Sequence, residues 1–108
     1  MRILLVKTSS YGDIIQAFPV VEYLRQRYPG CSIDWVVERR FSDVVHAHPH
    51  ISGVHIIDSR LWRKDIFSKD TWRDVRRFCS TLRQKKYDLA IDLQGNIKSG
   101  FVMAAVRA

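Results

Sequence analysis

Residues that could carry chemistry gather in three polar segments, and the first of them, residues 8–13, reads Thr-Ser-Ser-Tyr-Gly-Asp. Ser9 and Ser10 offer hydroxyl groups, and Gly12 lets the backbone approach a ligand closely. A helix that begins here would stabilise the charged form of Asp13, whose carboxylate could then act as a general base toward a hydroxyl group. The same residues also suit a plain helix entry, in which Asp13 is the N-cap and the serines close the turn.

The second segment, residues 58–64, concentrates positive charge around Trp62. Arg60 and Arg63 can form forked hydrogen bonds with a phosphate or a carboxylate, and Lys64 adds a point charge. Because three cations so close together repel one another, we expect an anion or an acidic side chain between them. A solvated surface loop is the alternative interpretation.

The third segment, residues 92–99, also suits a hydroxylated or anionic ligand. Gln94 and Asn96 can hydrogen-bond hydroxyl groups, and Gly95 relaxes the turn. Lys98 lies near the predicted start of a helix, where backbone N–H groups favour an anion. A simple helix-entry turn explains the same residues.

Other site chemistries lack the residues they need. His46, His48 and His50 are spaced across a predicted helix end and Pro49, so their rings are not expected to converge on a metal ion. The sequence contains neither GxxxxGK[ST] nor GxGxxG, which excludes a Walker loop and argues against a dinucleotide site. A receiver domain would have a similar length, with Asp58 near its phosphoacceptor position, but the turn after the first strand offers no carboxylates for Mg²⁺. We therefore expect no metal and no cofactor.

Hydrophobic patterning predicts the elements that position the three segments. Short apolar runs predict strands at residues 2–7, 32–38, 53–58 and 87–93. Helical spacing predicts helices at residues 13–27, 41–47, 69–86 and 99–107. Pro19 is expected to kink the first helix or to mark a tight first segment. The third helix has a predicted apolar side of Trp72, Val75, Phe78 and Leu82.

This alternation predicts an α/β fold, a Rossmann-like parallel sheet with helices on both faces and right-handed crossovers. Ligands bind at the carboxyl ends of such strands, where all three polar segments fall, and the first and third segments should be neighbours. A chain of 108 residues makes one domain at most. Because it stops inside a helical pattern, we expect a truncated product.

The net charge of +7 is concentrated between residues 60 and 86. Such a bias indicates an anionic partner, which could be nucleic acid, a phosphorylated glycolipid or an acidic membrane surface. No apolar run approaches the roughly 20 residues of a membrane helix, and no signal-peptide pattern is present, so a cytoplasmic protein is expected. Cys31 and Cys79 share no motif spacing and are expected to be reduced thiols.

Four stretches resemble the lipopolysaccharide heptosyltransferases of glycosyltransferase family 9, in the same order: MRILLVKTSSYGDIIQAFP, SIDWVVE, the triplet WRK at residues 62–64, and YDLAIDLQGNIKS. The KTSSxGD and DxQGxxKS pair favours the heptosyltransferase I branch over branch II. The resemblance covers nearly the whole chain. It implies a GT-B enzyme with two Rossmann-like domains, in which residues 1–108 are most of the N-terminal, acceptor-binding domain and the donor-binding C-terminal domain is absent.

The resemblance implies transfer of L-glycero-D-manno-heptose from ADP-heptose to a Kdo sugar of lipid A–Kdo, with inversion and without a metal. The enzyme would work at the cytoplasmic face of the inner membrane. Asp13 would match the general base. The matching acceptor-binding residues would be Ser9, Ser10, Gly12, Arg60, Arg63, Lys64, Gln94 and Lys98.

Two alternatives remain beside this interpretation. One is a basic, non-catalytic nucleic-acid-binding module, and the other is a related glycosyltransferase with a different sugar or acceptor. Leu61 departs from the resemblance, because relatives can carry another basic residue there. Without a second domain the chain alone is expected to show negligible transfer, because donor and acceptor are not brought together. No nucleic-acid partner is expected.

Overall fold

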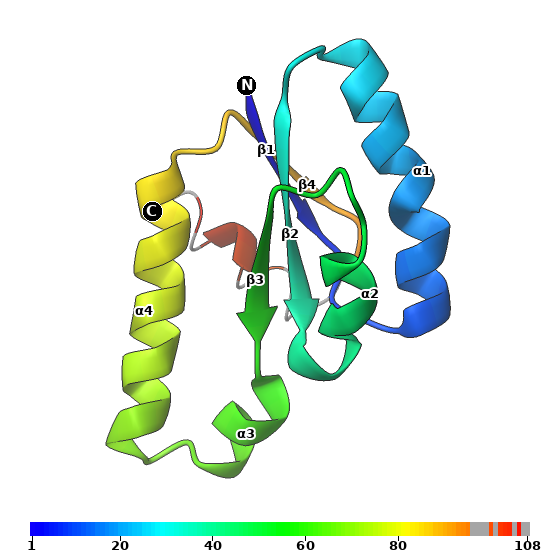
Figure 1. The fold of residues 1–108 in the computed structure, drawn as a ribbon. Coiled ribbons are helices and arrows are strands. Elements are labelled where there is room, and N and C mark those ends of the chain that lie inside the picture. Colours follow the sequence, from blue (N-terminus) through cyan, green and yellow to red (C-terminus); the bar gives the residue numbers. More distant parts are fainter. Residues whose placement is uncertain (96–99, 101, 105, 107–108) are drawn as a thin grey trace.

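The computed structural model describes residues 1–95, 100, 102–104 and 106. The elements follow one another as β1 (Arg2–Val6), α1 (Tyr11–Arg27), β2 (Ser32–Glu38), η1 (Arg39–Phe41), α2 (Ser42–His46), β3 (Gly53–Ile57), α3 (Ser59–Lys64), α4 (Lys69–Lys85) and β4 (Leu89–Asp92) (Figure 1). The strands form one parallel sheet in the order β3-β2-β1-β4. The predicted parallel α/β fold is confirmed, and β1 and β4 are neighbours as expected.

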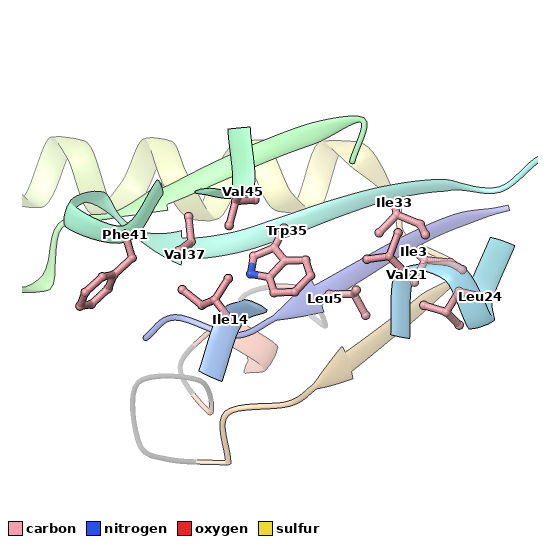
Figure 2. Packing of buried hydrophobic residues seen from close by; sticks show 10 residues of the cluster. All are labelled: Ile3, Leu5, Ile14, Val21, Leu24, Ile33, Trp35, Val37, Phe41 and Val45. Carbon is pink, nitrogen blue, oxygen red and sulfur yellow. The ribbon is translucent and has the colours of Figure 1, made fainter. Parts of the chain in front are cut away.

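Helices α1 and α2 cover one face of the sheet. The alternating residues Ile3, Leu5 and Trp35 of the strands pack there against the apolar side of α1 (Figure 2). The apolar residues of α1 recur at helical spacing and lie on one side: Ile14, Val21 and Leu24 are buried, and Ala17 and Phe18 pack against the same cluster.

Helix α4 covers the opposite face (Figure 1). Leu4, Val6 and Val36 point to that side, as expected where successive strand residues alternate between faces. Phe78 and Leu82 of α4 complete this second cluster together with Val102. The prediction of helices on both faces is confirmed.

The predicted apolar side of α4 is wrong at Trp72. Trp72 is 54% exposed, whereas Phe78 and Leu82 are buried. The reason is local: the indole Nε1 donates a hydrogen bond to the carbonyl oxygen of Ile66 at 2.7 Å. The ring therefore lies over the preceding loop instead of the sheet.

Two further local predictions differ from the structure. The segment 58–64, for which a surface loop was one interpretation, contains the short helix α3, and α1 begins at Tyr11, two residues before its predicted start at Asp13. Helix α1 continues through Pro19 without ending, and Pro19 is exposed, so water can bond the backbone carbonyl that a proline leaves without its N–H donor. None of the helices in the described residues is long and apolar enough to cross a membrane.

Candidate functional site

The carboxyl ends of the four parallel strands share one edge of the sheet, which lies near α3 at the bottom of Figure 1. The strand order arranges the following segments in a row, with residues 58–64 after β3, 39–41 after β2, 8–13 after β1 and 92–95 after β4. We call this row the carboxyl edge. All three predicted polar segments contribute to it, although residues 96–99, with Asn96 and Lys98, lie outside the described residues.

Gln94 links the first and third segments, as their predicted proximity requires. Its Oε1 accepts a hydrogen bond from the backbone N–H of Thr8 at 3.2 Å, and its Nε2 donates to Ser9 Oγ at 3.5 Å. Asp92 Oδ1 accepts from the N–H groups of Gln94 and Gly95, both at 2.9 Å. Gly95 has φ +69°, which a glycine adopts without strain, so its predicted role in the turn is confirmed.

Asp13 lies in the first turn of α1 and is exposed. Ser10 occupies the N-cap position, without a capping hydrogen bond from its side chain, and its carbonyl accepts from Ile14 N–H at 2.9 Å. The alternative that Asp13 itself is the N-cap is therefore wrong. Within the described part of the chain the Asp13 carboxylate has no hydrogen-bond or ion-pair partner. A Cβ added at Gly12 would meet nothing within 4 Å, so the space beside this turn is open.

The end of β2 lies between the Asp13 turn and α3. It is followed by Arg39, Arg40 and Phe41, for which no role was predicted from the sequence. The Tyr11 hydroxyl donates to the Arg40 carbonyl at 2.8 Å, and its ring meets Phe41 edge-on with centroids 4.9 Å apart. Desolvation, and then the neighbouring Asp43 carboxylate, raise the pKa of Tyr11. These contacts hold Arg40 beside the first turn of α1.

A basic hollow of about 470 Å³ opens between the ends of β2 and β3. Its lining residues are Glu38, Arg39, Arg40, Asp58, Arg60, Leu61 and Lys64. Arg39 Nε donates to Asp58 Oδ2 at 2.9 Å, which supplies the acidic residue expected among the cations. Arg63 does not line this hollow, and its Nε lies 3.4 Å from the Ser59 carbonyl.

Glu38 positions α3 above this hollow. Its side chain is buried and accepts hydrogen bonds from the Ser59 hydroxyl and from the Ser59 backbone N–H, the latter at 3.3 Å. A carboxylate that binds the first N–H groups of a helix also interacts favourably with the helix dipole. The first turn of α3 is thus tied to β2, which brings Arg60 and Lys64 to the same side.

The three predicted segments are not all in contact. Gln94 and Ser9 meet, whereas the Asp13 turn and α3 are two strand positions apart, which corresponds to about 10 Å between strand axes. Arg39 and Arg40 fill the interval. A signal for them was present in the sequence, because a polar pair directly after a predicted strand falls at the same edge as the other segments.

The histidine-rich segment forms no cluster that could hold a metal in the described residues. His48 Nδ1 accepts from the His50 backbone N–H at 3.1 Å, and its ring packs edge-on against Phe18 with centroids 4.7 Å apart. Burial, and then the charge of His50, lower the pKa of His48. These contacts give His48 a structural role on the α1 side of the sheet.

Comparison with known proteins yields relatives over almost the whole chain, although no family model matches. Lipopolysaccharide heptosyltransferase 1 of Pseudomonas aeruginosa is 40% identical over 102 residues, which cover 94% of this chain and 29% of that protein. The protein of the same name from Escherichia coli K12 is 38% identical over 99 residues, covering 92% and 31%. This chain therefore spans about a third of the length of these relatives.

Solved structures show the same relationship. The structure of E. coli heptosyltransferase WaaC with ADP-2-deoxy-2-fluoro heptose matches with a TM-score of 0.86 and 38% identity, over 99% of this chain and 33% of that one. E. coli ADP-heptose LPS heptosyltransferase II matches with a TM-score of 0.76 at 22% identity, over 99% and 28%, and at that identity shares the fold alone. The similarity to a type 1 enzyme therefore extends to sequence as well as to fold.

Proposed function

The chain belongs to the lipopolysaccharide heptosyltransferases, and from this we propose that it forms the N-terminal, acceptor-binding domain of an inverting transferase. The reaction is transfer of L-glycero-D-manno-heptose from ADP-heptose to a Kdo sugar of lipid A–Kdo. The observation that carries the proposal is the exposed Asp13 carboxylate in the first turn of α1, which has no partner among the described residues and lies at the same sheet edge as a row of cations. The chain that carries it is 36–40% identical to type 1 enzymes of three species.

Asp13 acts as the general base in this proposal. The acceptor hydroxyl oxygen attacks the anomeric carbon of the heptose while the hydroxyl proton passes to the Asp13 carboxylate. The bond from the anomeric carbon to ADP breaks on the opposite face, and ADP leaves with the electron pair, which inverts the anomeric centre. The open space at Gly12 admits the acceptor, and Ser9 and Ser10 lie in the same turn.

The basic hollow binds the negative groups of the acceptor. Arg40 and Arg60 suit a phosphate or carboxylate through forked hydrogen bonds, and Lys64 adds charge at the same wall. The axis of the strand that leads to α3 lies about 10 Å from that of the strand that leads to the Asp13 turn, which suits an acceptor whose anionic groups and reacting hydroxyl lie on different sugars. Arg63 and Lys98 remain predicted contacts, and Gln94 holds the two turns together at the edge.

Residues beyond this chain's third of the relatives' length would hold most of the donor. We infer that this chain alone gives negligible transfer, because closure of a second domain supplies the proximity and the stabilisation of charge on the leaving group. The enzyme would meet its lipid acceptor at the cytoplasmic face of the inner membrane. The chemistry assigned to Asp13 requires no metal, and no nucleic acid takes part.

Binding is tested by NMR titration of this chain with the delipidated oligosaccharide of Kdo–lipid A, with ADP-heptose as a parallel ligand. Shifts should cluster at residues 9–13, 39–40 and 60–64 with the oligosaccharide and remain small with ADP-heptose. Arg60→Ala with Lys64→Ala should weaken binding at least about tenfold, through loss of charge-assisted hydrogen bonds. Arg76→Ala, an exposed change on α4, is the matched control.

The role of Asp13 is tested separately, in a protein in which a donor-binding domain follows this chain. Asp13→Asn should lower kcat by about a thousandfold with KM nearly unchanged, because the base acts only in the transition state. An unchanged kcat would refute the assignment. A folded chain that ignores the oligosaccharide but binds random RNA with a steep salt dependence would favour a nucleic-acid-binding module instead.

A further inference from the structure

Four large apolar side chains are exposed on the segment that runs from α3 through the following loop into α4. Phe67 is 96% exposed, and Leu61, Ile66 and Trp72 are each about half exposed. We call these four residues the α3–α4 patch. Large apolar side chains gathered on one short segment are characteristic of a surface that is covered by a partner.

The loop has a defined shape that keeps Phe67 outward. Trp72 Nε1 donates to the Ile66 carbonyl at 2.7 Å, and Ser68 N–H donates to the Asp65 carbonyl at 2.9 Å. Ser68 Oγ also caps α4 by accepting from Asp70 N–H at 3.1 Å. These three hydrogen bonds close the turn from which Ile66 and Phe67 project.

Positively charged residues flank the patch in the sequence. The flanking cations are Arg60, Arg63, Lys64, Lys69 and Arg73, and the acidic residues among them are Asp65 and Asp70. The segment from Arg60 to Lys86 holds ten of the 18 Lys and Arg residues and three of the 11 acidic residues of the chain. Apolar side chains at the tip of a turn with cations around them match the boundary of a bilayer, where acyl chains lie beneath anionic headgroups.

We propose that the α3–α4 patch docks on an anionic phospholipid bilayer, with Phe67 and Ile66 entering the headgroup region and the flanking cations contacting lipid phosphates. Leu61 and Arg60 lie on α3, which also lines the basic hollow. Docking through α3 would therefore hold the hollow close to the membrane surface. The benefit of docking to the transferase rests on the proposed function. Docking itself does not, because it can be tested with vesicles that contain no acceptor.

The test is sedimentation of the chain with vesicles of phosphatidylcholine alone, or of phosphatidylcholine and phosphatidylglycerol in equal parts. Binding should require phosphatidylglycerol, and the tryptophan emission of the chain should shift to the blue because Trp72, one of its three tryptophans, is exposed. Phe67→Ala should weaken partitioning about tenfold, through loss of buried apolar area. Arg63→Ala and Lys69→Ala should each weaken it roughly fivefold.

Matched controls lie on α1, away from the patch. Tyr23→Ala removes an aromatic side chain that is 63% exposed, and Arg27→Ala removes an exposed cation, and neither should change partitioning. Circular dichroism confirms that each variant is folded. No binding by the folded chain, binding unchanged by Phe67→Ala, or equal binding to both vesicles would overturn the proposal. Dimerisation that Phe67→Ala abolishes, without vesicle binding, would assign the patch to a second copy instead.

Discussion

Two aspartates at opposite ends of the sheet, Asp34 and Asp13, have contrasting surroundings. Toward the amino end, Asp34 of β2, His55 of β3 and Tyr87, just before β4, form one closed network. The Tyr87 hydroxyl donates to Asp34 Oδ2, and His55 Nε2 lies 3.3 Å from the same oxygen and 2.8 Å from the Tyr87 hydroxyl. At the carboxyl edge, Asp13 is exposed without a partner among the described residues, and the buried hydroxyl of Thr8 also has none there.

Burial explains the difference. Asp34 is 7% exposed, and a buried carboxylate is tolerated only where donors replace its water. Since the one Tyr87 O–H is donated to Asp34, His55 must carry a hydrogen on Nε2 to face both oxygens. The bond from Tyr87 to Asp34 reaches across β1, because β2 and β4 flank that strand. The network therefore serves the cohesion of the sheet, whereas the carboxyl edge leaves its carboxylate available to a ligand.

Asp34→Ala is the substitution with the largest expected effect on folding. The free energy of unfolding should fall by about 3 kcal/mol, because Tyr87 and His55 lose their acceptor inside the protein. Urea denaturation followed by circular dichroism measures this. Asp13→Ala, the same change at the carboxyl edge, should alter the free energy of unfolding by less than about 0.5 kcal/mol. Equal losses in the two variants would remove the distinction between the two ends.

Asp34 also shows where prediction of the fold from sequence stops. The apolar runs at residues 2–7 and 32–38 predict buried strands, and helical spacing predicts both layers, because these patterns are local. The sequence pattern places Asp34 in the strand at residues 32–38 and predicts no hydrogen-bond partner for it. Its partners His55 and Tyr87 are 21 and 53 residues away, so they meet only once the strands are paired. One local signal was present: Asp34 and Glu38 are four residues apart in an apolar run, so they fall on the same face of the strand.

For the site, the sequence predicted which segments lie near one another but not the shape of the surface they form. The rule that ligands bind at carboxyl strand ends brought residues 8–13 and 92–95 together before any coordinates, and the Gln94 bonds agree with it. The shape of the hollow was not predictable, because it depends on how Glu38 turns α3 and on which side of that helix each cation falls. Arg63 was selected with Arg60 for its charge, although it does not line the hollow.

Gly53→Ala tests the importance of the Asp34 network by placing a methyl group against the Asp34 side chain. A Cβ at Gly53 would lie 2.7 Å from Asp34 Oδ1, so the carboxylate must shift, which disturbs the bonds made by its other oxygen, Oδ2. The free energy of unfolding should fall by about 2 kcal/mol. Gly12→Ala, at the open carboxyl edge, should leave stability unchanged or raise it by up to about 1 kcal/mol, because alanine favours the helix. Thermal and urea denaturation of both variants would reveal a loss at Gly12 that contradicts the open space there.

The Tyr87 phenol should make the free energy of unfolding depend on pH in the alkaline range. Burial, and then the hydrogen bond and charge of Asp34, raise the pKa of Tyr87. A raised folded-state pKa means that the stabilisation is fully present below the unfolded pKa of about 10 and is lost as the pH rises above it. Between pH ~10 and ~11 the free energy of unfolding should therefore fall by up to about 1.4 kcal/mol from this group. In Tyr87→Phe this part of the slope should be absent, whereas Tyr23→Phe, an exposed control, should keep it.

Substitution of Gln94 has the smallest expected effect on stability. It tests the contrast between the two ends of the sheet directly, because Gln94 lies at the carboxyl edge but hydrogen-bonds Thr8 and Ser9 of the protein itself. Gln94→Met removes the acceptor of the Thr8 N–H and should lower the free energy of unfolding by about 1 kcal/mol. Gln94→Glu keeps an acceptor oxygen at the same place and should lower it by less. If urea denaturation finds no loss in Gln94→Met, the amide is free to bind a ligand, and the edge is more open than its hydrogen bonds indicate. If both variants lose stability equally, the N–H that Gln94 donates to Ser9 is the feature that matters, because glutamate has no N–H to donate and can meet Ser9 only by accepting from its hydroxyl.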